Sequence, residues 1–118
     1  MYPDRARTPP MPARSYLAVE EPEHSFPRRL SIIGDLDLAT ASALAKRLDE
    51  FQAARIDVRL DLSMLQFIDS TGIRVLVTTA YHAREDAEWT FGVERTLDPI
   101  VRQTLKSANV ENWILGEH

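Results

Sequence analysis

The segment IDVRLDL, residues Ile56–Leu62, decides the predicted fold class of this chain. Its apolar residues alternate strictly with Asp57, Arg59 and Asp61. This is the period of a β-strand that has one buried face and one solvated face. A strand that helices cover on both faces reads instead as a continuous apolar run. The segment therefore predicts a sheet whose helices lie mainly on one side.

Periodic segments on both sides of this strand predict an alternation of strands and helices. Two segments have apolar residues at spacings of three and four, which is the pattern of amphipathic helices. Thr40 is in the position of an N-cap, and Asp98 followed by Pro99 is typical of a helix start. Asn109 is suited to a left-handed cap after the last helix. In chain order, the predicted elements are strands at residues 15–20 and 28–33, a helix at 39–51, a strand at 56–62, a helix at 73–84, a strand at 89–93, a helix at 99–108 and a strand at 113–115.

The order of these elements predicts one α/β domain over residues 14–118. The first two strands are joined by a long loop, and we expect them to form an antiparallel hairpin. Short connections and right-handed crossovers make the remaining strands parallel. We therefore expect a mixed sheet of about five strands with helices mainly on one face. Residues 1–13 hold four of the seven prolines and almost nothing to bury, so we interpret them as a flexible tail.

The composition is that of an ordinary soluble globular domain, and it argues against several classes of function. The formal charge of −4 and the absence of a Lys/Arg patch argue against nucleic acid as a partner. There is no cysteine, which excludes disulfides and thiolate metal sites. No apolar run is long enough to span a bilayer, and the N-terminus lacks the apolar core of a secretory signal. We expect a cytoplasmic protein that binds neither nucleic acid nor membranes.

Two polar turns are expected at the carboxyl edge of the parallel strands, where open α/β sheets usually hold their sites. The first is GDLD, Gly34–Asp37, and the second is DSTG, Asp69–Gly72, and the strand order predicts that they are neighbours. The simplest interpretation of GDLD is a turn glycine followed by solvent-facing carboxylates, and that of DSTG is helix capping. Capping is compatible with a further role. A phosphate added to a hydroxyl at a helix start meets free N–H groups and the positive end of the helix dipole.

A second hypothesis for the same turns is a magnesium site for phosphotransfer. Asp35, Asp37 and Asp69 would supply the carboxylate oxygens that Mg²⁺ prefers. Such sites also need a lysine at the end of a later strand, and Lys106 falls inside a predicted helix instead. The histidines share no ligand spacing, and neither a GxSxG motif nor a glycine-rich phosphate loop is present. We therefore expect no enzymatic activity, no metal and no cofactor.

Three segments resemble the anti-sigma factor antagonist family, the bacterial STAS domains. DLSMLQFIDSTGIRVL at residues 61–76 is similar to the signature of that family. GDLDLATA at 34–41 resembles its GELD-type turn and the helix that follows, and LDPIVRQTLKSANVENWI at 97–114 resembles its last helix and strand. The likeness covers nearly the whole domain. The chain departs from the family at REDAE, residues 84–88, where members often carry a glycine pair.

The resemblance implies both a fold and a mechanism. The fold is a βα domain with its helices on one side, and the serine directly after the aspartate, here Ser70, is the phosphorylated residue. Thr71 is the less favoured acceptor, by its position. The partner is an anti-sigma factor with a histidine-kinase-like ATPase domain, which acts as the serine kinase, and a serine/threonine phosphatase resets the switch. The unphosphorylated antagonist binds this partner and frees the sigma factor, which regulates transcription.

The expected partner surface extends from the two turns along the predicted helix at 73–84. The side of this helix opposite its buried stripe carries Arg74, Val75, Thr78, Thr79 and His82. An alternative within the family is a scaffold subunit of a stress-sensing or lipid-transport complex, where the same surface docks partners without a sigma pathway. The predicted contact residues are Asp35, Asp37, Asp69, Thr71, Gly72, Arg74, Val75 and Thr78.

Overall fold

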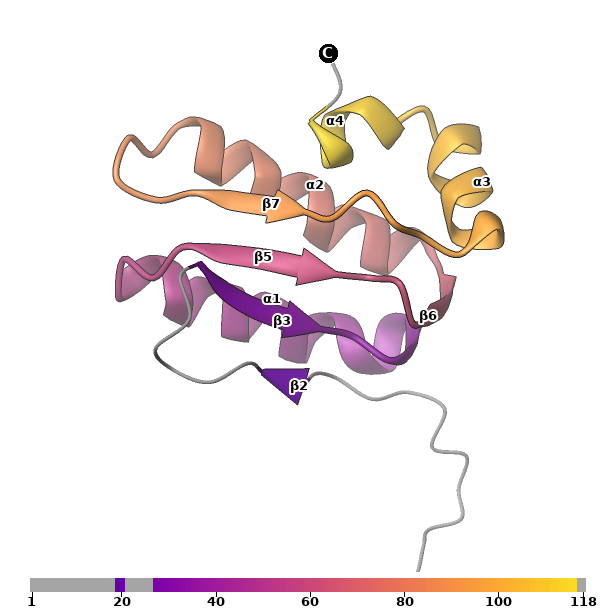
Figure 1. Cartoon of the computed structure of the whole chain (residues 1–118), viewed down its shortest axis with the longest axis horizontal. Helices are drawn as coiled ribbons and strands as arrows, with labels where there is room; N and C mark the ends of the chain where they lie inside the picture. The colour runs from indigo at the N-terminus through magenta and orange to yellow at the C-terminus, as the bar shows by residue number, and fades with distance from the viewer. Residues whose placement is uncertain (1–18, 21–26, 117–118) are drawn as a thin grey trace, which may run out of the picture.

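The structure is a computed structural model that describes residues 19–20 and 27–116. The predicted tail at 1–13 and most of the first predicted strand lie outside these residues. None of the helices in the described ranges is long and apolar enough to cross a membrane. The elements, drawn in Figure 1, are β2 (Val19–Glu20), β3 (Arg28–Ser31), β4 (Gly34–Leu36), α1 (Leu38–Ala53), β5 (Val58–Asp61), β6 (Leu65–Ile68), α2 (Ser70–Arg84), β7 (Phe91–Val93), α3 (Pro99–Ser107) and α4 (Glu111–Leu115).

The strands form two sheets instead of the single mixed sheet that the sequence predicts. The larger sheet has the order β2-β3-β5-β7, and the smaller one pairs β4 with β6. The pairing of β2 with β3 is antiparallel but covers only two residue pairs, whereas β3-β5, β5-β7 and β4-β6 are parallel. β4 lies in the GDLD segment that the sequence predicts to be a turn, and β6 lies in a segment for which the sequence analysis predicts no strand. The architecture is therefore two largely parallel sheets, and a hairpin does not dominate it.

A turn between β5 and β6 separates the two sheets. The backbone N–H of Ser63 donates to the Asp61 carboxylate at 2.9 Å, and the N–H of Leu65 donates to the Leu62 carbonyl oxygen at 3.0 Å. Between β3 and β4 the chain turns at Gly34, whose φ of 95° favours glycine. The chain thus turns out of the large sheet after β3 and after β5, whose last residues, Ser31 and Asp61, are paired. The two strands that follow these turns, β4 and β6, therefore lie next to each other and pair.

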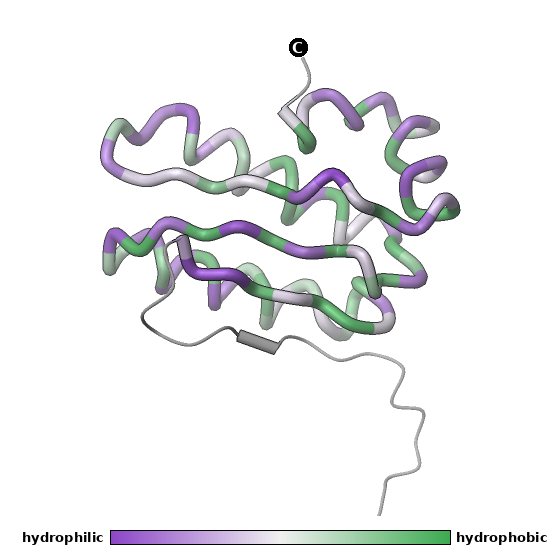
Figure 2. The backbone as a smooth tube through the Cα atoms, in the orientation of Figure 1, coloured by the Kyte–Doolittle hydropathy of each residue, from purple (hydrophilic) through white to green (hydrophobic). Residues whose placement is uncertain are grey.

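Helices cover one face of the large sheet, in agreement with the alternation in residues 56–62. Both α1 and α2 lie behind this sheet in Figure 1. The hydropathy of β5 alternates along the chain in Figure 2, and Arg59 is exposed between two buried neighbours. On the open face, Arg29 forms ion pairs with Asp61 at 3.2 Å and with Glu94 at 2.9 Å. The open face is thus polar, and the apolar residues of the sheet point toward the helices.

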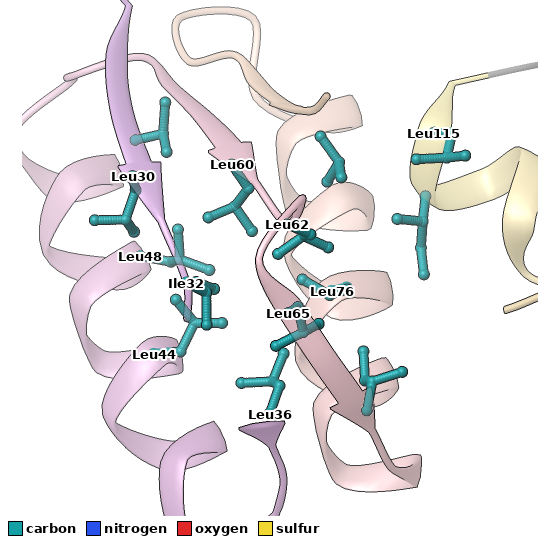
Figure 3. Close-up of a cluster of buried hydrophobic side chains, with 14 of the residues drawn as sticks. Leu30, Ile32, Leu36, Leu44, Leu48, Leu60, Leu62, Leu65, Leu76 and Leu115 are labelled. Atoms are coloured by element: carbon teal, nitrogen blue, oxygen red, sulfur yellow. The ribbon is translucent and has the colours of Figure 1, made fainter. Parts of the chain in front are cut away.

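Leucine side chains fill the space between the sheets and the helices (Figure 3). Leu44 of α1 and Leu76 of α2 have no exposed surface. Leu36 of β4 and Leu65 of β6 belong to the same buried cluster, so one core holds both sheets. Truncating a buried leucine of this kind to alanine costs about 2–5 kcal/mol. The small sheet, whose ends carry the polar turns, is therefore anchored to the rest of the domain.

The strand predicted at residues 113–115 is wrong, because these residues belong to α4. Asn109 is left-handed (φ 61°) directly after α3, as predicted, and Gly116 (φ 72°) ends α4 in the same conformation. Between these two turns a short helix buries Ile114 and Leu115. A short apolar run has no period that would distinguish a helix from a strand. As a consequence, no described strand pairs with the outer edge of β7.

Candidate functional site

The two polar turns meet at the end of the small sheet. In the pairing of β4 with β6, Asp35 is opposite Phe67 and Leu36 is opposite Ile68. Just beyond the strands, the backbone N–H of Asp69 donates to the carbonyl oxygen of Leu36 at 3.2 Å. The prediction that GDLD and DSTG are neighbours is confirmed. They meet through paired strands, which place the starts of α1 and α2 beside each other.

Asp37 begins α1, which corrects the prediction that Thr40 is the N-cap. The Asp37 carboxylate accepts hydrogen bonds from the N–H groups of Ala39 at 3.0 Å and Thr40 at 3.3 Å. The Thr40 hydroxyl accepts in return from the Asp37 N–H at 3.0 Å. This reciprocal capping box satisfies N–H groups that the first helical turn leaves without partners. The Asp37 carboxylate is therefore engaged in starting the helix.

Asp35 is buried, with 8% of its surface exposed, so the interpretation of GDLD as two solvent-facing carboxylates is wrong for this residue. Its carbonyl oxygen accepts from the Thr40 hydroxyl at 3.0 Å, which ties β4 to the first turn of α1. Within residues 27–116, no three His, Asp or Glu side chains are grouped to hold a metal ion. Asp35, Asp37 and Asp69 therefore do not gather into the trio that the magnesium hypothesis requires.

Asp69 caps α2 and lies close to the start of α1. Its carboxylate accepts from the N–H groups of Thr71 at 2.9 Å and Gly72 at 3.1 Å, and from the Thr71 hydroxyl at 2.5 Å. The Thr71 hydroxyl does most to hold the pKa of Asp69 below its usual value. The N–H groups of Gly72, Thr71 and Leu38 lower the pKa further, while burial opposes them. Asp69 is therefore a carboxylate at neutral pH, stabilised by the first turns of both helices.

Ser70 is the first residue of α2, and it is exposed. No described residue forms a hydrogen bond with its hydroxyl. The neighbouring Thr71 is half-buried, and its hydroxyl donates to Asp69. The site thus has one accessible hydroxyl and one that is engaged. A phosphate on Ser70 would lie at the positive end of the α2 dipole, next to the Asp69 carboxylate.

Gly72 allows α2 to approach the small sheet closely. It is buried, and a Cβ at this position would lie 2.7 Å from the Leu36 carbonyl oxygen and 2.9 Å from Ile68 Cγ1. Carbon atoms in contact are normally about 3.5–4.0 Å apart, so a larger residue does not fit here without a shift. Gly72 therefore sets the position of the helix start that carries Ser70 and does not itself lie on the surface.

The outer surface of α2 differs in part from the predicted one. Arg74, Thr78 and His82 are exposed, as expected for a solvated helix face. Thr79 is buried, so its predicted place on this face is wrong, and Val75 is half-buried and packs against the core. The exposed face of α2 is therefore narrower and more polar than predicted.

Two exposed apolar residues near Ser70 were missed by the sequence analysis. Leu38 at the start of α1 is 76% exposed, and Phe67 of β6 is 48% exposed. The N–H of Leu38 helps to lower the pKa of Asp69, and Phe67 is two residues before Asp69 in the chain. Phe67 belongs to the apolar run LQFI, whose sequence does not indicate which residue faces outward. Leu38 directly follows the capping Asp37, and its position at the start of a helix could have predicted that its side chain is exposed.

Comparisons with known proteins find the same fold. A protein-family model described as "Mlab, STAS domain" matches residues 20–116. The crystal structure of an anti-sigma factor antagonist from Mycobacterium paratuberculosis is similar, with a TM-score of 0.65 and 27% identity over 80% of this chain and 79% of that chain. The phosphorylated form of the Bacillus cell fate determinant SpoIIAA has a TM-score of 0.60 over 81% of this chain and 86% of that chain, and its 14% identity shows a likeness of fold alone. No curated protein sequence matches the chain significantly.

Proposed function

Because the chain belongs to the STAS domain family, we propose that it is an anti-sigma factor antagonist that regulates transcription by partner switching. In this proposal the unphosphorylated chain binds an anti-sigma factor whose histidine-kinase-like ATPase domain is also a serine kinase. Phosphorylation of Ser70 releases the partner, and a serine/threonine phosphatase restores binding. The chain acts in the cytoplasm as a binding protein and not as an enzyme. The 27% identity to the mycobacterial antagonist supports this assignment.

The observation that carries the proposal is the difference between two adjacent hydroxyls. Ser70 is exposed at the first position of α2, whereas the Thr71 hydroxyl is bonded to Asp69 in the cap of the same helix. A kinase needs an accessible hydroxyl, and a phosphate on Ser70 would leave the capping bonds in place. Ser70 is therefore the preferred acceptor.

Electrostatic repulsion accounts for the release of the partner. A phosphate adds about −1.5 to −2 charges at pH 7, beside Asp69, which is already ionised. Two like charges about 4 Å apart repel by about 4 kcal/mol at an effective dielectric constant of about 20. Since about 1.4 kcal/mol changes an affinity tenfold, one phosphate facing one carboxylate of the partner would weaken binding by roughly two to three decades. The domain itself need not refold.

The proposed docking surface is centred on Ser70. Arg74 and Thr78 extend it along α2. We include in it the exposed apolar residues Leu38 and Phe67, which are close in the chain to the GDLD and DSTG turns. Exposed apolar groups with a polar rim are typical of protein interfaces. The other predicted contact residues are buried or half-buried and support this surface: Asp35, Asp37, Asp69, Thr71, Gly72 and Val75.

Intact-mass measurement of the chain isolated from its own cells, with and without phosphatase, tests the choice of acceptor. We expect one phosphate that phosphatase removes, that Ser70→Ala abolishes and that the matched variant Thr71→Val retains. A Ser70→Ala protein that still carries phosphate on Thr71 would contradict the choice.

Partner capture by the Ser70→Asp variant tests the mechanism. We expect this variant to recover at least tenfold less ATPase partner than Ser70→Ala in affinity purification, because it places a negative charge at the interface. Its melting temperature should stay close to that of the unchanged chain, because the Ser70 side chain is exposed. If Ser70→Asp unfolds the domain, repulsion at the interface is not the mechanism.

The matched family model favours one further candidate, the scaffold subunit of a stress-sensing or lipid-transport complex. Its description names the Mlab STAS domain and not an anti-sigma factor antagonist. In this case the surface around Ser70 docks a complex that lacks a serine kinase. Mass spectrometry of the proteins captured by Ser70→Ala separates the two: an ATPase with a sigma factor partner supports the antagonist, and a transport or sensor complex supports the scaffold.

A further inference from the structure

A groove lies between the outer edge of β7 and helix α4. Its volume is about 380 Å³, and it shares no lining residue with the surface around Ser70. Small residues of α2, Ala80 and Ala83, line it together with the aromatic side chains of Phe91 and Trp113. β7 is the edge strand of the large sheet, and α4 lies on its outer side in Figure 1, so a further strand would have to pair with β7 on the side of this groove.

The edge of β7 that faces this groove has free hydrogen-bonding groups. The Thr90 carbonyl oxygen accepts from β5 at 3.1 Å, and the Glu94 N–H donates to β5 at 2.8 Å. Backbone groups of successive residues in a strand point to opposite sides, so those of Phe91 and Val93 point away from β5. No described residue forms a hydrogen bond with them. Such an edge is a template for pairing with another extended chain.

The groove is positively charged, although the chain as a whole has a formal charge of −4. Arg59, Arg84 and Arg95 line it, and no Asp or Glu of the described residues is among the lining residues. Glu94 lies beside the groove and forms an ion pair with Arg59 at 3.8 Å, which leaves the lining with an excess of positive charge. The Arg84 guanidinium lies 4.3 Å from the centre of the Trp113 ring and forms no ion pair with a described residue. A cation held over an aromatic ring in this way is oriented before any ligand arrives. The groove therefore favours an anionic occupant.

We propose that this groove binds an extended acidic segment of another protein, which adds to β7 as a further strand. Backbone hydrogen bonds to Phe91 and Val93 would supply affinity, and alternating side chains would supply specificity. Apolar side chains of the segment would face the helix side of the sheet, and its carboxylates would face Arg59 on the open side. This inference does not depend on the function proposed for the Ser70 site.

Charge argues against two other occupants of the groove. A second copy of the chain, paired through its own β7, would bring two sets of the three groove arginines together. The N-terminal residues 1–18 of this chain carry three arginines and one aspartate, so they are also repelled. An acidic segment from another protein is the occupant whose charge complements the groove.

Titration of the full ¹⁵N-labelled chain with a capped peptide of about six residues, in which Val and Glu alternate, tests the proposal. We expect the amide signals of Phe91 and Val93 to shift and their hydrogen exchange to slow, because these N–H groups gain acceptors. A peptide of the same length with Lys in place of Glu should bind at least roughly tenfold more weakly. Equal binding of both peptides, or shifts without slower exchange at these two amides, would refute the added strand.

Two exposed arginines provide matched variants, Arg59 in the groove and Arg74 outside it. Arg59→Glu should weaken binding of the Val–Glu peptide roughly tenfold, whereas Arg74→Glu should leave it unchanged. The spectra of both variants also report whether the domain remains folded. Equal affinities of the two variants would contradict the assigned groove, and sedimentation of the free chain as a dimer with protected Phe91 and Val93 amides would assign the edge to a second copy instead.

Discussion

Replacing Gly72 with alanine tests the close contact between α2 and the small sheet. The new Cβ would lie 2.7 Å from the Leu36 carbonyl oxygen and 2.9 Å from Ile68 Cγ1. The first of these is a backbone atom, so either β4 or the start of α2 must move, and overpacking of this kind costs about 1–3 kcal/mol. The better helix propensity of alanine offsets at most about 1 kcal/mol of that cost. We expect a net loss of about 1–2 kcal/mol, which lowers the melting temperature by roughly 5–15 °C in a domain of this size.

Gly92→Ala is the matched control for this experiment. A Cβ at Gly92 would meet Arg59 Nη1 at 3.4 Å, which is the end of a flexible side chain. We therefore expect a change within about 0.5 kcal/mol. Thermal and urea unfolding followed by circular dichroism measure both variants. If Gly72→Ala is as stable as Gly92→Ala, the helix does not approach β4 in the way described, and the placement of Ser70 that follows from it is wrong.

Three further substitutions test the cap, the open face and the core. Asp69→Ala should lower the free energy of unfolding by about 1 kcal/mol at pH 7. The pKa of Asp69 is lowered in the folded state, so its carboxylate stabilises the fold fully above the unfolded pKa of about 3.9. This stabilisation is lost as the pH falls through the folded pKa. Urea midpoints of the variant and the unchanged chain should therefore converge below about pH 4, and a constant difference would contradict the cap. Arg29→Ala removes ion pairs to Asp61 and Glu94 on the surface, so we expect a loss of at most about 1 kcal/mol that shrinks in about 1 M salt, measured by urea unfolding. Leu76→Ala should cost about 2–5 kcal/mol in the same assay, and a smaller loss would show that α2 packs less tightly than its full burial indicates.

The parts of the fold that could be predicted are those with a period or a capping signal of their own. The alternation in 56–62 corresponds to β5, and the stripe in 73–84 corresponds to α2. Asp98 caps α3 with Pro99 at its first turn, as predicted from residue preferences alone. The small sheet could not be predicted in this way. Its strands are three and four residues long, and their pairing depends on turns that bring distant segments together.

The candidate site also has features that could be predicted from the sequence and features that could not. DSTG as a capped helix start and its proximity to GDLD could be predicted from element order. The burial of Asp35 could not, because it depends on how β4 pairs with β6 and on the first turn of α1 packing over it. The exposure of Phe67 could not be predicted either, because buried and exposed residues do not alternate along β6. Leu65 and Ile68 are buried, and the two residues between them are exposed. Side-chain exposure at the ends of short strands is a tertiary property.

The arrangement of the two hydroxyls at the start of α2 explains why a charge added at one of them can change docking without unfolding the domain. The Ser70 hydroxyl has no bond to a described residue that a phosphate would break, and the cap made by Asp69 stays intact. A negative group at a helix N-terminus gains about 0.3–1 kcal/mol from the helix dipole, which opposes its repulsion by Asp69. A phosphate on Thr71 would instead break that hydroxyl's bond to Asp69 and force a half-buried group outward. Phosphorylation of Ser70 would therefore disturb the fold less than phosphorylation of Thr71, while a docked carboxylate would lose several kcal/mol, on the order of 4 for one close pair.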